Sequence, residues 1–209
     1  MLKIGLTGNI GSGKTVVSGI FATLGIPIYH ADEESKKFLD DPAVKNEIVK
    51  QFGYGVLTNG QEINRRSLAT IVFTDPLALQ ELNSILHPRV RIDFRNWAIR
   101  QVTKPYVVQE AAIIFESGFS EEYDFIIHTS CPKEIAIERV IKRDKIDGHS
   151  VLRRMQFQLD DAEKSRLSDF VIQNDGSQLV IPQVLAIHYK LLEVSAQRNN
   201  EVTPGIVDA

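Results

Sequence analysis

The stretch GNIGSGKT, residues 8–15, directly follows the apolar run LKIGLT, residues 2–7. It matches the pattern G-x-x-x-x-G-K-[ST] through Gly8, Gly13, Lys14 and Thr15. Glycines let backbone N–H groups approach phosphate oxygens without an intervening Cβ, and a following helix presents its positive end to the same anion. A glycine-rich turn that binds nothing is the alternative. The full pattern between a predicted strand and a predicted helix favours a nucleoside triphosphate site.

Individual residues of this stretch have predicted roles around the phosphates. Lys14 would reach the β- and γ-phosphates, and the Thr15 hydroxyl would bind Mg²⁺. The predicted nucleotide-binding residues are Gly8, Asn9, Ile10, Gly11, Ser12, Gly13, Lys14, Thr15 and Val16.

Five short apolar runs predict the strands of one sheet, at residues 2–7, 26–32, 106–113, 125–131 and 169–175. Several are almost continuously apolar, which is typical of strands covered on both faces. Between the first two, apolar residues recur at helical spacing, and Gly25 is the predicted stop. Strand, helix and strand in that order indicate a parallel sheet. The predicted fold class is therefore α/β, a P-loop NTPase core with a five-stranded parallel sheet.

Two long intervals between the predicted strands indicate insertions. Residues 33–105 hold several helical patterns and predict a helical insertion that binds the phosphate acceptor; residues 140–166 predict a lid. The nucleotide-binding core would then comprise residues 1–32, 106–139 and 167–198, with a loose polar tail at 199–209. This layout suits a small-molecule kinase, because one insertion can hold the acceptor while the other excludes water.

Composition limits the remaining classes. The chain has 209 residues, 43% of them hydrophobic, and a formal net charge of −3, which argues against a nucleic-acid binder. Its single cysteine, Cys131, cannot form an internal disulfide and fits a reducing compartment. The chain shows neither a signal-peptide pattern nor an apolar run long enough to span a membrane. We expect a cytoplasmic protein without a membrane partner, as a monomer or small homo-oligomer.

Two other nucleotide-binding classes fit the sequence less well. A regulatory GTPase would carry N-K-x-D and D-x-x-G elements, and neither occurs in the chain. A mechanical ATPase would have an apolar strand that ends in an aspartate for water activation, and Glu110 is the nearest substitute. Both absences favour a kinase.

Two carboxylates are candidates for the acceptor side. Asp32 is predicted to end the second strand, at the edge where ligands bind in open α/β sheets, and could accept the proton of an attacking hydroxyl or help hold Mg²⁺. The alternative role is a helix N-cap. Glu110 is predicted to end the third strand at the same edge, as a contact of the acceptor or of a magnesium-bound water. A surface charge at a strand end is the alternative for Glu110.

The segment 139–166 is rich in basic residues. Arg139 and Arg143 are four positions apart and share one face of a predicted helix. Phosphoryl transfer spreads charge over the γ-phosphate oxygens, and arginines of a closing lid can neutralise it. A solvated charged helix is the alternative. The position directly after the fourth predicted strand favours the lid.

Taken together, these pieces resemble the dephospho-CoA kinase family over residues 2–177. The resemblance extends beyond the phosphate loop to further motifs in family-like order: LGIPIYHAD at 24–32, FG at 52–53, NRRSL at 64–68, LNSILHPRV at 82–90, IIFESG at 113–118, ERVIKRD at 138–144, RMQFQ at 154–158 and VIQNDGS at 171–177. It implies transfer of the γ-phosphate of ATP to the ribose 3′-hydroxyl of dephospho-CoA with Mg²⁺ present.

The resemblance also implies residue roles. Asp32 becomes the general base, and Arg66, His87 and Arg91 fall in the acceptor-binding insertion. Arg139, Arg143 and Arg154 fall on the lid and its flank. The chain departs from the family pattern at Glu110 and Ala112, where many members have aspartate and proline, and at Asn9, where glycine is frequent.

The sequence leaves two other functions open. A nucleoside or nucleoside-monophosphate kinase would share the core and differ in its acceptor, and a regulatory module would bind nucleotide without transfer. Acceptor-dependent ADP release separates them. His87 alone fits a packed histidine as well as a ligand contact. The sequence assigns no function to His30, His128 or His149, and Cys131 is predicted to be a small buried residue.

Overall fold

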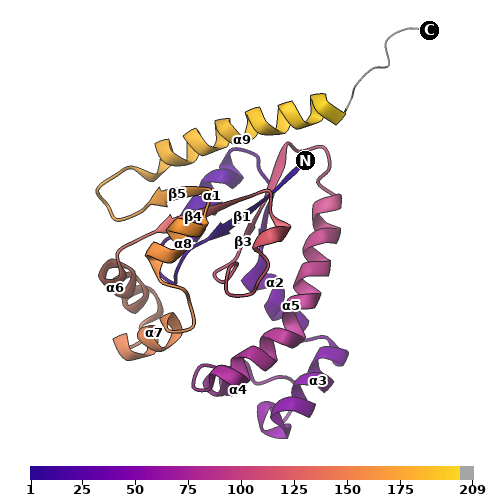
Figure 1. Cartoon of the computed structure of the whole chain (residues 1–209). Helices are drawn as coiled ribbons and strands as arrows, with labels where there is room; N and C mark the ends of the chain where they lie inside the picture. Colours follow the sequence, from indigo (N-terminus) through magenta and orange to yellow (C-terminus); the bar gives the residue numbers. More distant parts are fainter. Residues whose placement is uncertain (203–209) are drawn as a thin grey trace, which may run out of the picture.

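The computed structural model of the protein describes residues 1–202 and contains one sheet of five parallel strands (Figure 1). The order across the sheet is β2-β3-β1-β4-β5. The predicted α/β fold with a five-stranded parallel sheet is confirmed. β3 and β4 flank β1 on opposite sides, so the winding reverses beside β1, where ligands bind in open α/β sheets. The strands are β1 Leu2–Thr7, β2 Ile28–His30, β3 Tyr106–Glu110, β4 Phe125–Ser130 and β5 Phe170–Gln173.

Helices connect the strands. The helices are α1 Lys14–Thr23, α2 Ala31–Phe38, α3 Pro42–Phe52, α4 Arg65–Val72, α5 Pro76–Ile99, α6 Lys133–Asp144, α7 Gly148–Met155, α8 Asp161–Leu167 and α9 Val180–Val202, with short 3₁₀ turns at Tyr54–Val56 and Ser120–Glu122. Gly25 follows α1 with a φ of 80°, and its N–H bonds the Ala22 carbonyl at 2.9 Å, as expected for a helix stop. No helix within residues 1–202 is both long and apolar enough to cross a membrane.

Both faces of the sheet are covered, which explains the continuous apolar strands. On one face, Leu6 of β1 packs in a cluster with Phe21 of α1 and Leu191 of α9. On the other face, Val107 of β3 packs with Phe94 of α5. Figure 1 shows α9 running along one side of the sheet and α5 along the other.

The helices α2 to α5 lie between β2 and β3 and have a hydrophobic cluster of their own. Val44 and Ile48 of α3 are fully buried in it, together with Leu68 of α4 and Leu86 of α5. Asp75 caps α5 by accepting from the Leu77 N–H at 2.9 Å. In Figure 1 this group of helices extends away from the sheet on the side opposite α9.

The structure corrects several predicted boundaries. β2 ends at His30 because α2 begins at Ala31 without a connecting loop. β3 ends at Glu110 rather than at residue 113, since its partner β1 ends at Thr7 and the phosphate loop follows. Residues 199–202 continue α9 and are not part of a tail, while residues 203–209 of the predicted tail lie outside the described residues.

Candidate active site

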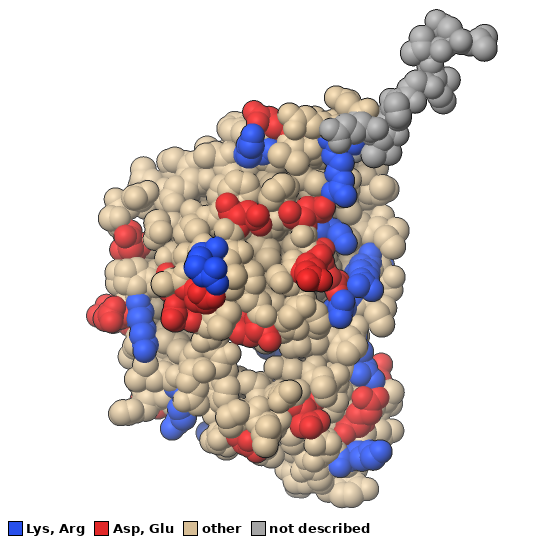
Figure 2. All heavy atoms as spheres, in the orientation of Figure 1, with Lys and Arg blue, Asp and Glu red and all other residues tan. Residues whose placement is uncertain are grey.

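A cleft separates the carboxyl edge of the sheet from the helices α2 to α5. Its volume is about 1280 Å³, and Figure 2 shows the molecule hollowed between the part that carries the sheet and the lower part. The cleft is lined by the phosphate loop 8–15, by α2, α4 and α5, by the loop 111–119 after β3, and by residues from the lid segment. A smaller cavity of about 130 Å³ shares Asp32, His87 and Arg91 with it.

The phosphate loop is pressed against its neighbours at its glycines. At Gly11, with a φ of 83°, a Cβ would lie 2.3 Å from the carbonyl oxygen of Ala136 on α6. At Gly13, with a φ of 98°, a Cβ would lie 2.1 Å from the Asn174 amide nitrogen. That amide donates to the Ser12 carbonyl at 2.7 Å, which fixes the loop on the side of Asn174. Val16 is exposed and lies in the first turn of α1, which begins at Lys14.

The Lys14 side chain folds back over this loop. Its Nζ donates to the Gly8 carbonyl at 2.7 Å and to the Asn9 carbonyl at 3.4 Å. Burial lowers the pKa of Lys14 to about 8, although the negative charges of Asp32 and Glu110 oppose that shift. Lys14, Asp32 and Glu110 are therefore close enough to interact electrostatically. Phosphates arriving at the loop would favour the charged ammonium.

Glu110 receives three polar contacts at the end of β3. Its oxygens accept from the Thr15 hydroxyl at 3.2 Å and the Ser18 hydroxyl at 3.0 Å, and His30 Nδ1 lies 2.7 Å from Oε2. The Glu110 side chain is 11% exposed, so Glu110 is not a surface charge. Ser18 and His30 are contacts that the sequence did not indicate.

The oxygens beside the phosphate loop fit a magnesium ion. Mg²⁺ prefers hydroxyl and carboxylate oxygens and is held through one or two carboxylates together with substrate phosphates. Thr15 and Glu110 supply such oxygens side by side at the end of the loop. Within residues 1–202, no group of three or more His, Cys, Asp or Glu side chains could hold a metal by itself.

Asp32 lies in the first turn of α2, not at the end of β2 and not at the N-cap, which is His30. The reason is the direct transition from strand to helix, which moves Asp32 to the second helical position. Asp32 lines both cavities, so it faces the phosphate loop on one side and α5 on the other. Solvent in the cleft reaches its carboxylate, yet the surrounding protein raises its pKa by desolvation, reinforced by Glu110 and opposed by Lys14.

The side of the cleft away from the phosphate loop is built around Phe119. The His87 ring meets the Phe119 ring edge-on, with centroids 5.4 Å apart, and the Arg91 guanidinium lies 4.3 Å from the same centroid. Arg91 also forms an ion pair with Glu122. Burial lowers the pKa of His87, which favours a neutral imidazole. His87, Arg91 and Phe119 line both cavities.

The predicted arginines are not all brought to the cleft. Arg143 and Arg154 line it, the first paired with Asp144 at 2.7 Å and the second 5.5 Å from the Phe73 ring centroid. Arg139 Nη1 donates a hydrogen bond to the Cys131 sulfur at 3.4 Å. Neither Arg139 nor Arg66 lines the cleft. In place of Arg66, its neighbour Arg65 lines the cleft. The functional roles of these arginines stay predictions.

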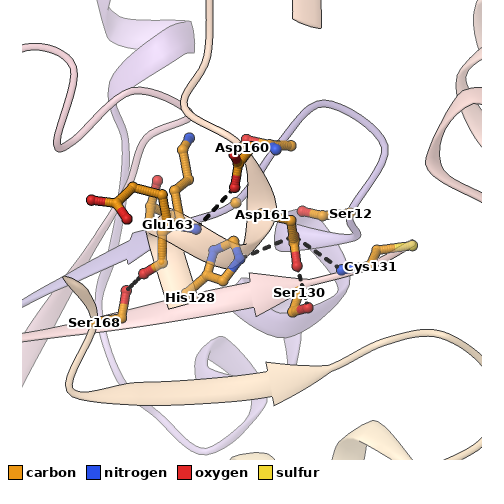
Figure 3. A network of polar contacts seen from close by, with 12 residues as sticks. Ser12, His128, Ser130, Cys131, Asp160, Asp161, Glu163 and Ser168 are labelled. Atoms are coloured by element: carbon orange, nitrogen blue, oxygen red, sulfur yellow. Dashed lines mark hydrogen bonds and ion pairs between the residues drawn. The ribbon is translucent and has the colours of Figure 1, made fainter. Parts of the chain in front are cut away.

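The lid segment returns to the core through several polar contacts. Gln158 Oε1 accepts from the Ile10 N–H of the phosphate loop at 3.0 Å. At the start of α8, Asp161 accepts from the Ser130 hydroxyl at 2.5 Å and lies 3.1 Å from His128 Nε2, as Figure 3 shows. Gln158 stands in the RMQFQ motif, but nothing in the sequence indicated that it meets the phosphate loop.

Comparison with known proteins agrees with this arrangement. The family model of dephospho-CoA kinase matches residues 2–179. A dephospho-CoA kinase from Bacteroides fragilis (strain YCH46) is 37% identical over 204 residues, which cover 95% of this chain and 99% of the relative. A solved structure of a protein from Thermus thermophilus is 28% identical, with a TM-score of 0.79 and coverage of 90% of this chain and 96% of the other.

A dephospho-CoA kinase from Campylobacter jejuni has a solved structure that is 26% identical. Its TM-score is 0.66, with coverage of 92% of this chain and 98% of the other. The match of the family model extends from β1 to the residues that follow β5 and includes the whole cleft. The chain belongs to the dephospho-CoA kinase family.

Proposed function

We propose that this protein transfers the γ-phosphate of ATP to the ribose 3′-hydroxyl of dephospho-CoA and releases coenzyme A and ADP. One structural observation supports this proposal. Asp32 lines both the large cleft and the smaller cavity, between Lys14 of the phosphate loop and Arg91 of α5. A carboxylate placed between a phosphate site and a second site is what hydroxyl phosphorylation requires. The family relationship supports the choice of acceptor.

The nucleotide side is assigned to the phosphate loop. Backbone N–H groups of residues 8–16 would hold the triphosphate, and the Lys14 ammonium would leave the Gly8 carbonyl for the β- and γ-phosphate oxygens. Thr15 would hold Mg²⁺ directly, and Glu110 would hold a water bound to it. The ion supplies charge neutralisation on the β- and γ-phosphates when it is present.

Asp32 is assigned as the general base. Its carboxylate would accept the proton of the attacking hydroxyl as the oxygen approaches the γ-phosphorus atom. Desolvation and the nearby Glu110 raise its pKa, which makes it a stronger base than an exposed aspartate. The positive charge of Lys14 opposes that rise in the pKa of Asp32.

The remaining site residues divide between acceptor and lid. His87 and Arg91, which both contact the Phe119 ring, would contact dephospho-CoA. Arg66 is proposed to act with them, although it does not line the cleft in this structure. Arg143 and Arg154 face the cleft, and with Arg139 they would neutralise charge on the transferring group when the lid closes.

The same proposal covers the organisation of the chain. Residues 1–32, 106–139 and 167–198 would act as the nucleotide-binding core, residues 33–105 as the acceptor insertion and residues 140–166 as the lid. A cytoplasmic location and a monomer or small homo-oligomer belong to the proposal as well.

The test is ADP release from MgATP by the purified protein. Dephospho-CoA, AMP, a nucleoside or no acceptor is added in parallel reactions, and coenzyme A is identified by mass. Turnover with dephospho-CoA alone is the expected result. Turnover with AMP or a nucleoside alone would show that the protein is a kinase for a different acceptor. ATP binding without any transfer would favour a regulatory module. A reaction without Mg²⁺ tests whether transfer requires the ion, and we expect transfer to stop.

A further inference from the structure

Lys164 on α8 is fully buried, which is rare for a lysine. Its Nζ donates to Glu116 Oε1 at 2.8 Å and to the Ala112 carbonyl at 2.8 Å. Burial lowers the pKa of Lys164, and the charge of Glu116 opposes that shift. An ammonium group in the interior is costly unless it is paired and hydrogen-bonded. The chain keeps such a pair between α8 and the loop 111–119, which forms one wall of the cleft.

Glu116 depends on few donors for its position. Oε1 accepts from Lys164 and from the Leu159 N–H at 2.9 Å. Oε2 is buried and has no hydrogen-bond partner among the described residues. Glu116 lines the large cleft, and its side chain is 14% exposed. Without Lys164, this carboxylate would keep a single backbone donor and an uncompensated charge beside the substrates.

The helix that carries Lys164 is fixed on two sides. Asp161, one turn earlier on α8, contacts Ser130 and His128 at the end of β4 (Figure 3). Lys164 fixes the same helix to the loop 111–119. Directly before α8, Gln158 contacts the Ile10 N–H of the phosphate loop. The segment 158–164 therefore joins the lid, the phosphate loop and the wall of the cleft.

The charge of Lys164 also acts at the phosphate site. Burial is the main cause of the lowered pKa of Lys14, and repulsion from Lys164 contributes in the same direction. Lys164 therefore acts on Lys14 through its charge, although its own hydrogen bonds go to Glu116 and Ala112. A residue that does not touch substrate but fixes groups around it acts by positioning.

We propose that Lys164 is a positioning residue for phosphoryl transfer. It holds the Glu116 carboxylate and the Ala112 carbonyl, and thereby fixes the loop 111–119 relative to the lid segment. This inference rests on the proposed function. Positioning errors of about 1 Å can cost on the order of 10²-fold in rate, so loss of these contacts should lower catalysis without removing the nucleotide site.

The decisive variant changes both partners, Lys164→Met with Glu116→Gln. Breaking a buried pair by removing one partner is strongly destabilising, whereas neutralising both partners avoids a buried unpaired charge. We expect Lys164→Met alone to lower Tm by about 10 °C and the double variant to recover most of that loss. Because neither substituted side chain restores the lost contacts, we expect kcat/KM for dephospho-CoA to stay about tenfold or more below wild type. The ATP dissociation constant should be unchanged.

A matched control lies on the same helix. Arg166 and Glu163 form an exposed pair at 2.7 Å, and Arg166→Met with Glu163→Gln removes the same types of charge away from the cleft. The control should match wild type in every measurement. Wild-type kcat/KM in the Lys164 and Glu116 double variant would overturn the inference, because a structural role predicts recovery of kinetics together with Tm.

The experiment also separates this inference from the proposed function. If wild type shows no transfer to dephospho-CoA in the same assay, the proposed function fails; if wild type and the double variant are equally active, only the positioning role fails. Should the double variant not fold, Glu116→Gln alone decides. It keeps the shape of the side chain but leaves the buried Lys164 ammonium without its counter-charge, so we expect a lower Tm together with a several-fold loss of kcat/KM measured well below that Tm. Unchanged kinetics would again overturn the inference.

Discussion

The two halves of the cleft are built in different ways. The phosphate half is one contiguous stretch of backbone, residues 8–16, pressed against α6 and the segment after β5 where Gly11 and Gly13 leave no room for a Cβ. The acceptor half is made of side chains from separate elements, with His87 and Arg91 on α5 around Phe119 of the loop 111–119. Under the proposed function, the first half would bind its ligand through backbone N–H groups and the second through aromatic and charged side chains.

This difference predicts how the halves respond to mutation. A backbone site has few side chains to remove, so its weak points are Lys14 and the glycines that allow close packing. A side-chain site distributes its contacts over several residues, so single changes should weaken acceptor binding modestly and leave ATP binding intact. Asp32 lines both cavities and belongs to neither half.

The largest effect should come from Asp32→Asn. An amide cannot accept the hydroxyl proton, and positioned general bases contribute about 10²- to 10⁴-fold, so we expect kcat to fall within that range. ATP affinity should be unchanged because the interaction matters in the transition state. Steady-state kinetics and ATP titration measure the two quantities. Glu33→Gln, an exposed neighbour in the same turn, is the control, and near-normal turnover of Asp32→Asn would remove the base assignment.

Lys14→Ala should have the next largest effect, and it should differ from Asp32→Asn in kind. Loss of one preorganised donor to a transferring group costs about 10²- to 10³-fold in kcat. Because Lys14 also holds the ground-state phosphates, ATP should bind more weakly too. Lys37→Ala removes an exposed lysine of α2 as the control. Unchanged kinetics of the Lys14 variant would contradict the phosphate-loop assignment itself.

The same contrast explains how much the sequence could predict. The phosphate loop is contiguous, so its pattern predicted the strand, the loop and the helix together. Five apolar runs predicted the five strands because burial on both faces demands continuous apolar residues. The boundaries were less well predicted, since the end of β2 is set by the immediate start of α2 at Ala31, which apolar patterning does not show.

The rest of the site depends on contacts between distant residues. Glu110 meets Ser18 across 92 positions and His30 across 80, and only the parallel order of β2, β3 and β1 brings these residues together. Arg139 and Arg143 share a helix in the sequence prediction, yet only Arg143 lines the cleft. Spacing along one helix shows which residues share a face, but not which way that face is turned in the fold.

A smaller effect should separate two glycines with the same backbone conformation. Gly11 and Gly25 have φ values of 83° and 80°, but a Cβ at Gly25 meets nothing within 4 Å. Gly25→Ala should lower the free energy of unfolding by about 1–2 kcal/mol, the cost of the left-handed conformation. Gly11→Ala should cost about 1–3 kcal/mol more because α6 must move, and ATP should bind more weakly. Urea unfolding and ATP titration measure both, and equal losses would contradict the packing of the loop on α6.

The smallest effect should follow Phe119→Leu on the acceptor side. Leucine keeps an apolar side chain but removes the ring that lies 4.3 Å from the Arg91 guanidinium and meets His87 edge-on. A cation–π contact contributes about 0.5–2 kcal/mol, so KM for dephospho-CoA should rise between about twofold and thirtyfold. The ATP dissociation constant should not change. Phe73→Leu tests the lid side, where Arg154 lies 5.5 Å from the ring centroid and the contact is weaker. If Phe119→Leu weakened ATP binding as much as acceptor binding, the two halves would not be separate sites, and the division drawn from their construction would be wrong.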